Sequence, residues 1–198
     1  MIEFNKLNQT SPYIVFKKKY DEALNAGQRN IEAIHISSYN KSIDEVDARL
    51  VNLKFIDNNN FIFFSNYNSP KSIAFDSYNQ ICALFFWSAT NVQIRMKAKI
   101  RRMPTKYNNQ YFKNRSLDKN ALAISSNQSK EISSYDEVIA RYMKTKKLED
   151  LAKCPDYWGG FSFVPYYFEF WEGNESRINK RESFILVDDN WNKSNLQP

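Results

Sequence analysis

The stretch "VQIRMKAKIRRM", residues 92–103, decides the fold class, because apolar and polar side chains alternate along it. One set comprises Val92, Ile94, Met96, Ala98 and Ile100, and the other comprises Gln93, Arg95, Lys97, Lys99 and Arg101. Successive side chains of a β-strand point to opposite faces. The alternation therefore predicts a strand with one buried face and one wet face, which is typical of an antiparallel sheet or barrel.

The segments on both sides of this stretch predict further strands. Patterned apolar runs bounded by turn residues predict strands over 31–40, 44–56, 61–67, 80–89, 161–173 and 182–196. Residues 58–60 form a turn, and residues 188–190 make a hairpin within the last segment. The abundance of Phe and Tyr agrees with a strand-rich chain, because aromatic residues make up 16% of the sequence and pack well on pleated surfaces.

Helices are predicted at the start and in the middle of the chain. Residues 11–27 read as an amphipathic helix with Ser11 as N-cap, Pro12 at its first position and Gly27 as its stop. Further helices are predicted over 69–79, 105–115, 117–127 and 134–152, the last opened by a Ser134–Glu137 capping box. This order predicts an α+β fold with a strand-rich core that can close into a small barrel.

The length and the cysteines bound the organisation of the chain. Its 198 residues suit one domain, residues 1–198, without a repeat or linker. No apolar run approaches the roughly 18 residues of a membrane span, and the first residues do not resemble a signal peptide. Cys82 and Cys154 are far apart and read as two buried thiols in a reducing compartment, so we expect a cytoplasmic protein.

Charge and rare residues exclude several functions. The net charge is +6, but the basic residues are spread along the chain, which favours a solvated surface or small anionic ligands such as phosphates over nucleic acid. The single histidine, His35, rules out a multi-histidine zinc site and reads as a half-buried strand residue, and we expect no metal. Four glycines cannot build a GxGxxG or Walker A loop, so side chains must bind any phosphate.

Two sets of cations are spaced for anion binding. Tyr111 and Arg115 are four apart on one predicted helix, and Lys119 joins their face if the helical path continues. Arg177 and Arg181 are also four apart, and they follow Trp171. The second pair reads either as a clamp for an anion or ring, or as ordinary solvated charges.

An ordered set of motifs runs through nearly the whole chain. The motifs are "RLVNLK" (49–54), "FFSNYNSPK" (63–71), "QS" (128–129), "YWGGFSFVP" (157–165), "EFWEG" (169–173), "RINKR" (177–181) and the closing Trp191, Leu196 and Pro198. In this order they resemble the pyridoxamine 5'-phosphate oxidase family. The resemblance implies a small antiparallel split β-barrel with surrounding helices, and a homodimer with FMN sites between its subunits.

The resemblance also implies the residues around FMN. One detail conflicts with simple alternation: Arg49 and Lys54 are five apart, so a flat strand would place them on opposite faces unless a bulge intervenes or one reaches the site from the strand end. Gln93 would come from the partner subunit. The implied cofactor set is Arg49, Leu50, Val51, Asn52, Leu53, Lys54, Phe64, Ser65, Lys71, Gln93, Gln128, Ser129, Trp171 and Arg181.

By the same resemblance, the substrate phosphate is bound by Lys54, Tyr111, Arg115 and Lys119, and the catalytic positions over the substrate ring are Arg177 and Asn179. Three positions depart from the family pattern. Pro70 stands where the family has an arginine, Lys119 where it has a phosphate-binding serine, and Asn179 where it has a histidine.

The implied activity is oxidation of pyridoxamine or pyridoxine 5'-phosphate to pyridoxal 5'-phosphate, with O2 as acceptor and H2O2 as by-product. The cofactor carries this chemistry, which agrees with a chain poor in histidine and glycine. Two alternatives stay open because of the departures: a related FMN-binding oxidoreductase with another substrate, and a non-enzymatic protein that binds flavin or pyridoxal phosphate.

Overall fold

The alternating stretch forms the central strand β6 (Val92–Arg102) of a nine-stranded sheet in the computed structural model, which describes residues 1–198. Its apolar side chains are buried, from Val92 at one end to Ile100 at the other. β6 pairs with β5 (Gln80–Trp87) on one side and with β7 (Trp158–Glu172) on the other, both antiparallel. The prediction of one buried and one wet face is therefore confirmed.

Six strands close into a barrel. β2 (Ala33–Asn40) pairs with β5 and with β3 (Glu45–Asp57), and β4 (Asn60–Asn66) pairs with β3 and with β7. With β5–β6 and β6–β7, these pairings form a ring in which every pair is antiparallel. This confirms the predicted barrel and the α+β class. The sequence missed β1 (Glu3–Asn5), which joins β3 in parallel and is too short to show a period.

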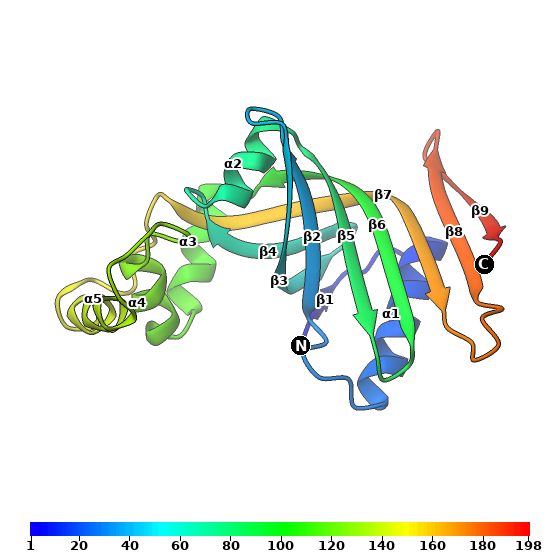
Figure 1. Ribbon diagram of the computed structural model, residues 1–198, viewed down its shortest axis with the longest axis horizontal. Coiled ribbons are helices and arrows are strands. Elements are labelled where there is room, and N and C mark those ends of the chain that lie inside the picture. Colours follow the sequence, from blue (N-terminus) through cyan, green and yellow to red (C-terminus); the bar gives the residue numbers. More distant parts are fainter.

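The last two strands extend from the barrel as a hairpin. β8 (Lys180–Val187) pairs with β7, and β9 (Asn190–Leu196) pairs with β8. Asp188 and Asp189 both have positive φ, as the predicted tight turn requires. The hairpin lies at the opposite end of the molecule from the helices that follow β6 (Figure 1).

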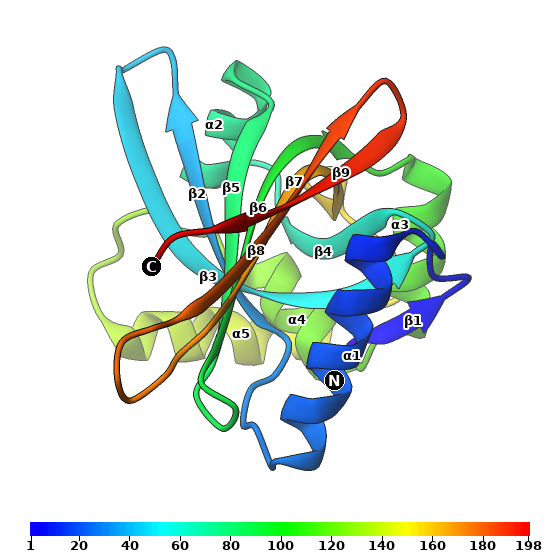
Figure 2. The same cartoon turned by 90° about the vertical axis from the view of Figure 1, so that its right-hand side faces the viewer.

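Helix α1 (Ser11–Asn25) lies beside the barrel (Figure 2), and aromatic side chains make the contact between them. Phe16 is fully buried, and its ring centroid lies 5.3 Å from that of Phe61 and 5.7 Å from that of Trp87. The predicted N-cap is one residue off: Thr10 caps the helix, because its carbonyl accepts the N–H of Ile14 and so begins the helical ladder. Gly27 follows the helix with a φ of +76°, as expected of a stop residue.

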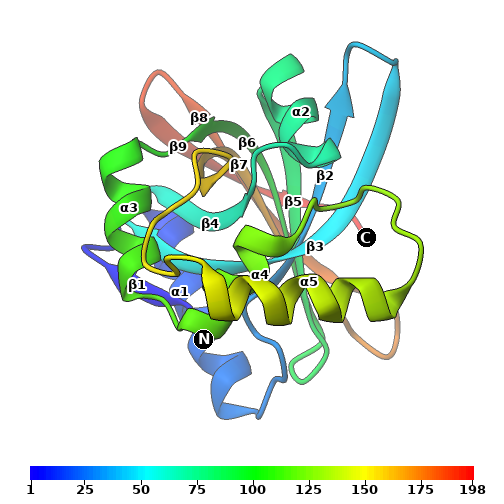
Figure 3. The ribbon, with the colours of Figure 1, turned by 90° about the vertical axis from the view of Figure 1, so that its left-hand side faces the viewer.

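Four helices lie outside the barrel: α2 (Pro70–Ser77), α3 (Thr105–Asn114), α4 (Leu117–Ser125) and α5 (Tyr135–Leu148). The Ser134 hydroxyl accepts the Glu137 N–H at 3.2 Å, which confirms the predicted cap of α5. α5 buries none of its residues and lies outside α4 (Figure 3). None of the helices combines the length and the apolar composition needed to cross a bilayer.

The single histidine follows the prediction, and the two cysteines follow it in part. His35 is half-buried on β2, as predicted. Cys82 and Cys154 are free thiols, as expected, but they are half-buried rather than buried. Both flank the barrel rather than fill it: Cys82 is on the wet face of β5, and Cys154 lies in the segment that leads into β7.

A buried polar contact ties α3 to β7 and explains why residue 159 is a glycine. The Asn108 amide donates to the Tyr67 hydroxyl at 3.0 Å and accepts the Gly160 N–H at 2.9 Å. The Tyr67 hydroxyl in turn donates to the Gly160 carbonyl at 3.1 Å. A Cβ on Gly159 would overlap both the Tyr67 hydroxyl and the Asn108 amide, so this position has no room for a side chain.

We expect Gly159→Ala to lower the free energy of unfolding by about 1–3 kcal/mol, because neither hydrogen-bonded neighbour can move away without losing a partner. Urea unfolding followed by far-UV circular dichroism measures the change. Gly27→Ala is the matched control: an added Cβ there meets nothing within 4 Å and costs only the left-handed backbone, about 1 kcal/mol. Unfolding of Gly159→Ala at the native midpoint would contradict the packing argument.

Candidate functional site

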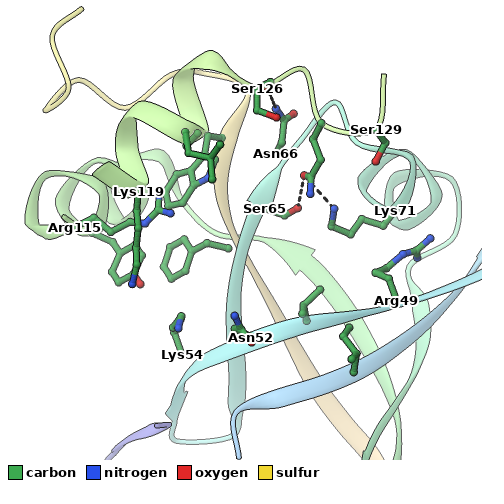
Figure 4. A pocket seen from close by; sticks show the side chains of 18 of the residues that line it. Arg49, Asn52, Lys54, Ser65, Asn66, Lys71, Arg115, Lys119, Ser126 and Ser129 are labelled. Atoms are coloured by element: carbon green, nitrogen blue, oxygen red, sulfur yellow. Dashed lines mark hydrogen bonds between the residues drawn. The ribbon is translucent and has the colours of Figure 1, made fainter. Parts of the chain in front are cut away.

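A cavity of about 940 Å³ opens between β3, β4 and the helices α2, α3 and α4 (Figure 4). Its volume lies at the upper end of the range for small-molecule sites. Of its 23 lining residues, 8 are hydrophobic. The sequence-predicted residues that line it are Arg49, Leu50, Val51, Asn52, Lys54, Phe64, Ser65, Lys71, Tyr111, Arg115, Lys119, Gln128 and Ser129.

A β-bulge brings Arg49 and Lys54 to the same cavity. In the β3–β4 pairing, Leu53 lies opposite Phe63 but Phe55 lies opposite Ile62, so Lys54 is an extra residue on β3. The bulge is one of the two explanations left open by the spacing of these residues. Leu53, also expected at the cofactor, does not line the cavity, because its side chain is fully buried in the barrel core.

One end of the cavity holds Lys71 and Arg49. The Lys71 ammonium is buried and donates to the Ser69 hydroxyl at 3.0 Å and to the Gln128 side-chain oxygen at 3.2 Å. Burial, and secondarily the nearby Arg49, lower the pKa of Lys71 to about 8. The Ser65 hydroxyl donates to the same Gln128 oxygen at 3.4 Å, so three predicted cofactor residues are in direct contact (Figure 4).

The Arg49 side chain is anchored from two sides. Its guanidinium donates to the Ser38 hydroxyl at 3.0 Å and forms an ion pair with Asp47. Burial lowers the pKa of Arg49, although an arginine remains charged at any physiological pH. This end of the cavity therefore presents two cations and one carboxylate.

The other end holds Lys54, Arg115 and Lys119, and none of the three has a carboxylate within ion-pair distance. The Arg115 guanidinium lies 4.6 Å from the centroid of the Trp158 ring, and burial lowers its pKa. Figure 4 shows Arg115 and Lys119 together, on the opposite side of Ser65 from Lys71 and Arg49. Three cations without carboxylate partners give this end of the cavity a positive charge that suits an anion.

The route by which Arg115 and Lys119 reach the cavity differs from the prediction. The expectation that Tyr111 and Arg115 share one helical face is wrong, because α3 ends at Asn114 and Arg115 has an extended backbone with φ −78° and ψ 158°. The condition for Lys119, a helical path that continues, is therefore not met. Lys119 lies in the first turn of the separate helix α4. A reversal of the chain, rather than a helical repeat, gathers these side chains with Tyr111.

An aromatic wall separates the two cationic ends. The Phe64 ring stacks on Tyr111 with centroids 3.7 Å apart and on Trp158 with centroids 5.2 Å apart. Trp158 lies in the motif over 157–165, but the resemblance assigns it no role, and its place before two glycines is its only sequence signal. The Asn66 side chain, also unassigned, donates to the Ser126 carbonyl at 3.3 Å and holds the segment after α4 against β4 (Figure 4).

Three predicted cofactor residues lie elsewhere on the chain. Gln93 is directly opposite Trp171, and Trp171 is directly opposite Arg181, so they form one row across β6, β7 and β8. None of them lines the cavity. The row belongs to the end of the barrel that carries the β8–β9 hairpin, away from α3 and α4 (Figure 1).

Arg181 is not an ordinary solvated charge. Its guanidinium pairs with Glu169 at 2.7 Å and donates to the Gln197 carbonyl at 2.8 Å. Glu169 is buried and also accepts hydrogen bonds from Arg95 and the Tyr167 hydroxyl. Burial alone would raise the pKa of Glu169, but hydrogen bonds from Arg95, Arg181 and Tyr167 outweigh it and hold that pKa below its usual value.

Arg177 and Asn179 lie in the loop between β7 and β8, and neither lines the cavity of its own chain. Arg177 is exposed and has a φ of +61°. The Asn179 side-chain oxygen accepts the Asn174 N–H at 3.0 Å and so closes the loop. Asn179 therefore has a structural contact that the sequence did not indicate, and within one chain it is far from the cavity residues assigned to the same substrate.

Known proteins resemble this chain in sequence and fold. Residues 158–198 match the family model described as the pyridoxine 5'-phosphate oxidase C-terminal dimerisation region. The chain is 31% identical to "Pyridoxine/pyridoxamine 5'-phosphate oxidase 1" of Hydrogenovibrio crunogenus over 96% of its length and 89% of that protein. It is 32% identical to the Coxiella burnetii pyridoxine/pyridoxamine 5'-phosphate oxidase, over 96% of each chain.

Solved structures share the fold. PhzG from Burkholderia lata 383, solved with tetrahydrophenazine-1-carboxylic acid, superimposes with a TM-score of 0.89 at 21% identity, over 95% of this chain and 93% of that one. A pyridoxamine 5'-phosphate oxidase-related, FMN binding protein from Nostoc punctiforme gives 0.78 at 11% identity, over 96% of this chain and all of that one. These likenesses confirm the split-barrel fold, and the identity to the curated relatives, over almost the whole length of both chains, shows that the chain belongs to the pyridoxine/pyridoxamine 5'-phosphate oxidase family.

Proposed function

We propose that the protein is an FMN-dependent oxidase that converts pyridoxamine or pyridoxine 5'-phosphate to pyridoxal 5'-phosphate, with O2 as acceptor and H2O2 as by-product. The observation that carries the proposal is the division of one cavity into two cationic ends on either side of an aromatic wall. A flavin mononucleotide and a pyridoxine-type substrate each bring one phosphate and one flat ring. Membership of the family supports the assignment of these two ligands.

The Arg49 and Lys71 end suits the cofactor phosphate. Both side chains can make charge-assisted hydrogen bonds, and both are held in place by Ser38, Ser69 and Gln128 before any ligand arrives. Ser65 and Gln128 then offer hydrogen-bonding groups at the polar edge of the ring. FMN, when bound, supplies the redox chemistry by accepting a hydride equivalent, and this agrees with a chain that needs no nucleophile.

The Lys54, Arg115 and Lys119 end suits the substrate phosphate, with the Tyr111 hydroxyl as a further donor. The three cations have no carboxylate partners, so a dianion gains their full charge without displacing an existing ion pair. Lys119 in place of the family's serine makes this end more positive. The chain's residues thereby bind and orient the substrate, while Phe64 and Trp158 form an apolar side of the cavity and exclude water there.

The separate row of Gln93, Trp171 and Arg181 supports a homodimer with a composite site. A row fixed by strand register cannot fold over to the Arg49 cavity of the same chain. A second copy can bring its own row, and its Arg177 loop, to that cavity. The matched dimerisation region contains Trp171, Arg177 and Arg181, which agrees with this arrangement. We therefore place each FMN between two subunits.

A second candidate is an FMN-binding oxidoreductase with a different substrate. The observation in its favour is the Asn179 amide, whose oxygen is engaged within its loop and whose side chain cannot titrate. Reduction of the bound flavin by a nicotinamide cofactor, without turnover of pyridoxamine 5'-phosphate, would favour this candidate over the oxidase.

The test of the main proposal is peroxide release. We expect the purified protein to be yellow or to take up FMN, and to form H2O2 and pyridoxal 5'-phosphate from pyridoxamine 5'-phosphate. Arg115→Ala and Arg177→Ala should each lower kcat/KM at least about tenfold at unchanged FMN content, because each removes a charge-assisted contact to substrate. Arg141→Ala, an arginine paired with Glu137 on the outer helix α5, is the control and should leave turnover unchanged. A protein that binds no FMN would refute the proposal.

The composite site predicts complementation between two inactive variants. Arg49→Ala and Arg181→Ala should each lose most FMN-dependent activity. Co-expressed with different tags, they form mixed dimers in which one of the two sites has both native halves. Random pairing then restores about a quarter of native activity, since half the dimers are mixed and each has one intact site. Light scattering should report a dimer for both variants. Mixed dimers without activity would show that both residues serve the same chain's site.

The low pKa of Lys71 predicts how FMN affinity depends on pH. Below pH 8 the free protein's Lys71 is charged and attracts the phosphate, and above pH 8 it must first take up a proton. The FMN dissociation constant should therefore rise through pH 8, by up to about tenfold per pH unit. Flavin fluorescence quenching between pH 7 and pH 9.5 measures it. Lys71→Arg, which stays charged, should remove the rise. Parallel curves for the two proteins would contradict the assignment of Lys71 to the phosphate.

A further inference from the structure

We propose that Asn120 is a positioning residue that holds the Arg115 guanidinium in the cavity without neutralising its charge. The inference rests on the proposed function, because it concerns the same anion-binding end of the cavity. Asn120 does not line the cavity, and its side chain is fully buried behind Arg115 at the start of α4. Neither its residue type nor its spacing marked it in the sequence.

Two backbone carbonyls fix the orientation of the Asn120 amide. Its Nδ2 donates to the Phe112 carbonyl in the last turn of α3 and to the Leu151 carbonyl in the segment after α5, each at 2.9 Å. An amide turned the other way would point its oxygen at two carbonyl oxygens, which repel it. The Asn120 Oδ1 is therefore left to face Arg115, whose NH1 donates to it at 3.4 Å.

The neutral acceptor matters because of what Arg115 must do. Arg115 has an extended backbone just beyond α3, so its helix does not hold the side chain in place. Its fixed neighbours are the Trp158 ring, 4.6 Å from the guanidinium carbon, the Phe112 ring at 5.9 Å, and the Asn120 oxygen, which is the one hydrogen-bond acceptor among them. A carboxylate at position 120 would pair with the guanidinium and cancel the charge that an incoming phosphate needs. An amide orients the guanidinium and leaves its positive charge intact.

The same side chain also sets the relative positions of the two cations. Asn120 joins the end of α3, the start of α4 and the segment that leads into β7. Arg115 precedes α4, and Lys119 lies within its first turn, directly before Asn120. The contacts of Asn120 therefore fix the relative positions of Arg115 and Lys119, although Asn120 itself does not contact the phosphate.

The experiment is a double-mutant cycle on ligand binding. Isothermal titration calorimetry with pyridoxal 5'-phosphate is carried out on the FMN-loaded native protein, Asn120→Ala, Arg115→Ala and the double variant. We expect Asn120→Ala to raise the dissociation constant about fivefold in the native background and less than about twofold in the Arg115→Ala background. Such coupling shows that Asn120 acts through Arg115, because a general loss of stability would weaken binding in both backgrounds.

The matched control is Asn108→Ala. Asn108 is also a buried amide that ties α3 to β7, but it contacts no cation of the cavity. The Asn108→Ala variant should lower the melting temperature as Asn120→Ala does, but its dissociation constant for pyridoxal 5'-phosphate should stay within about twofold of the native value. If Asn120→Ala does not fold, Asn120→Ser replaces it, since a hydroxyl can still donate to one carbonyl but cannot reach the guanidinium.

The outcomes separate the inference from the proposed function. Binding that is weakened by Arg115→Ala but unaffected by Asn120→Ala overturns the inference alone. Equal weakening by Asn120→Ala in both backgrounds, or by Asn108→Ala as much as by Asn120→Ala, also overturns it. A native protein that does not bind pyridoxal 5'-phosphate overturns the proposed substrate site, and the inference with it.

Discussion

The pairing of β7 with both β4 and β6 is the constraint on which the rest of the structure depends. β7 follows the helices α3 to α5, far along the chain from both partners, and its two ladders close the six-stranded ring. Closure buries the stacked rings of Phe61, Phe163 and their neighbours, and it leaves no room at Gly159 for a side chain. It also places Trp158, the first residue of β7, against Phe64 and Arg115, so the wall of the cavity is a consequence of barrel closure.

Electrostatics then divides the barrel into two kinds of cationic site. Arg95 and Arg181 converge on the buried carboxylate of Glu169, which compensates their charge and fixes their geometry. Lys54, Arg115 and Lys119 have no such carboxylate and are held by an aromatic ring, by an amide or by the backbone alone. Arg115 is half-buried and has no counter-ion, and burial lowers its pKa as it lowers the pKa of Lys71. These two side chains therefore gain the most from an incoming anion.

The cavity residues were predicted from the sequence to very different degrees. Arg49, Ser65, Lys71 and Gln128 were identified from their place in ordered motifs, and the structure puts them in contact or near contact. The conflict between Arg49 and Lys54 could be stated from spacing, but only the β4 register showed the bulge that resolves it. Asn120 has no sequence pattern, and Trp158 is marked only by its place in a motif, because the roles of both come from segments that meet only in space. The break between the helices predicted over 105–115 and 117–127 is present, but local sequence does not give the direction that the chain takes at Arg115, and this direction brings Arg115 and Lys119 to the cavity without a shared helical face.

The sequence by itself determined the period-2 strands, the aromatic-rich core, the capped helices and the lack of glycine loops or histidine clusters, because these depend on residues a few positions apart. Tertiary structure alone decided the closure of the barrel, the bulge at Lys54, the separation of the Gln93, Trp171 and Arg181 row from the cavity, and the support of Arg115 by Asn120. These features depend on strand register and on contacts between segments that are distant in the chain. The alternation along each strand decides which face is buried, but the choice of partner strand and the extra residue of a bulge depend on contacts across the whole barrel.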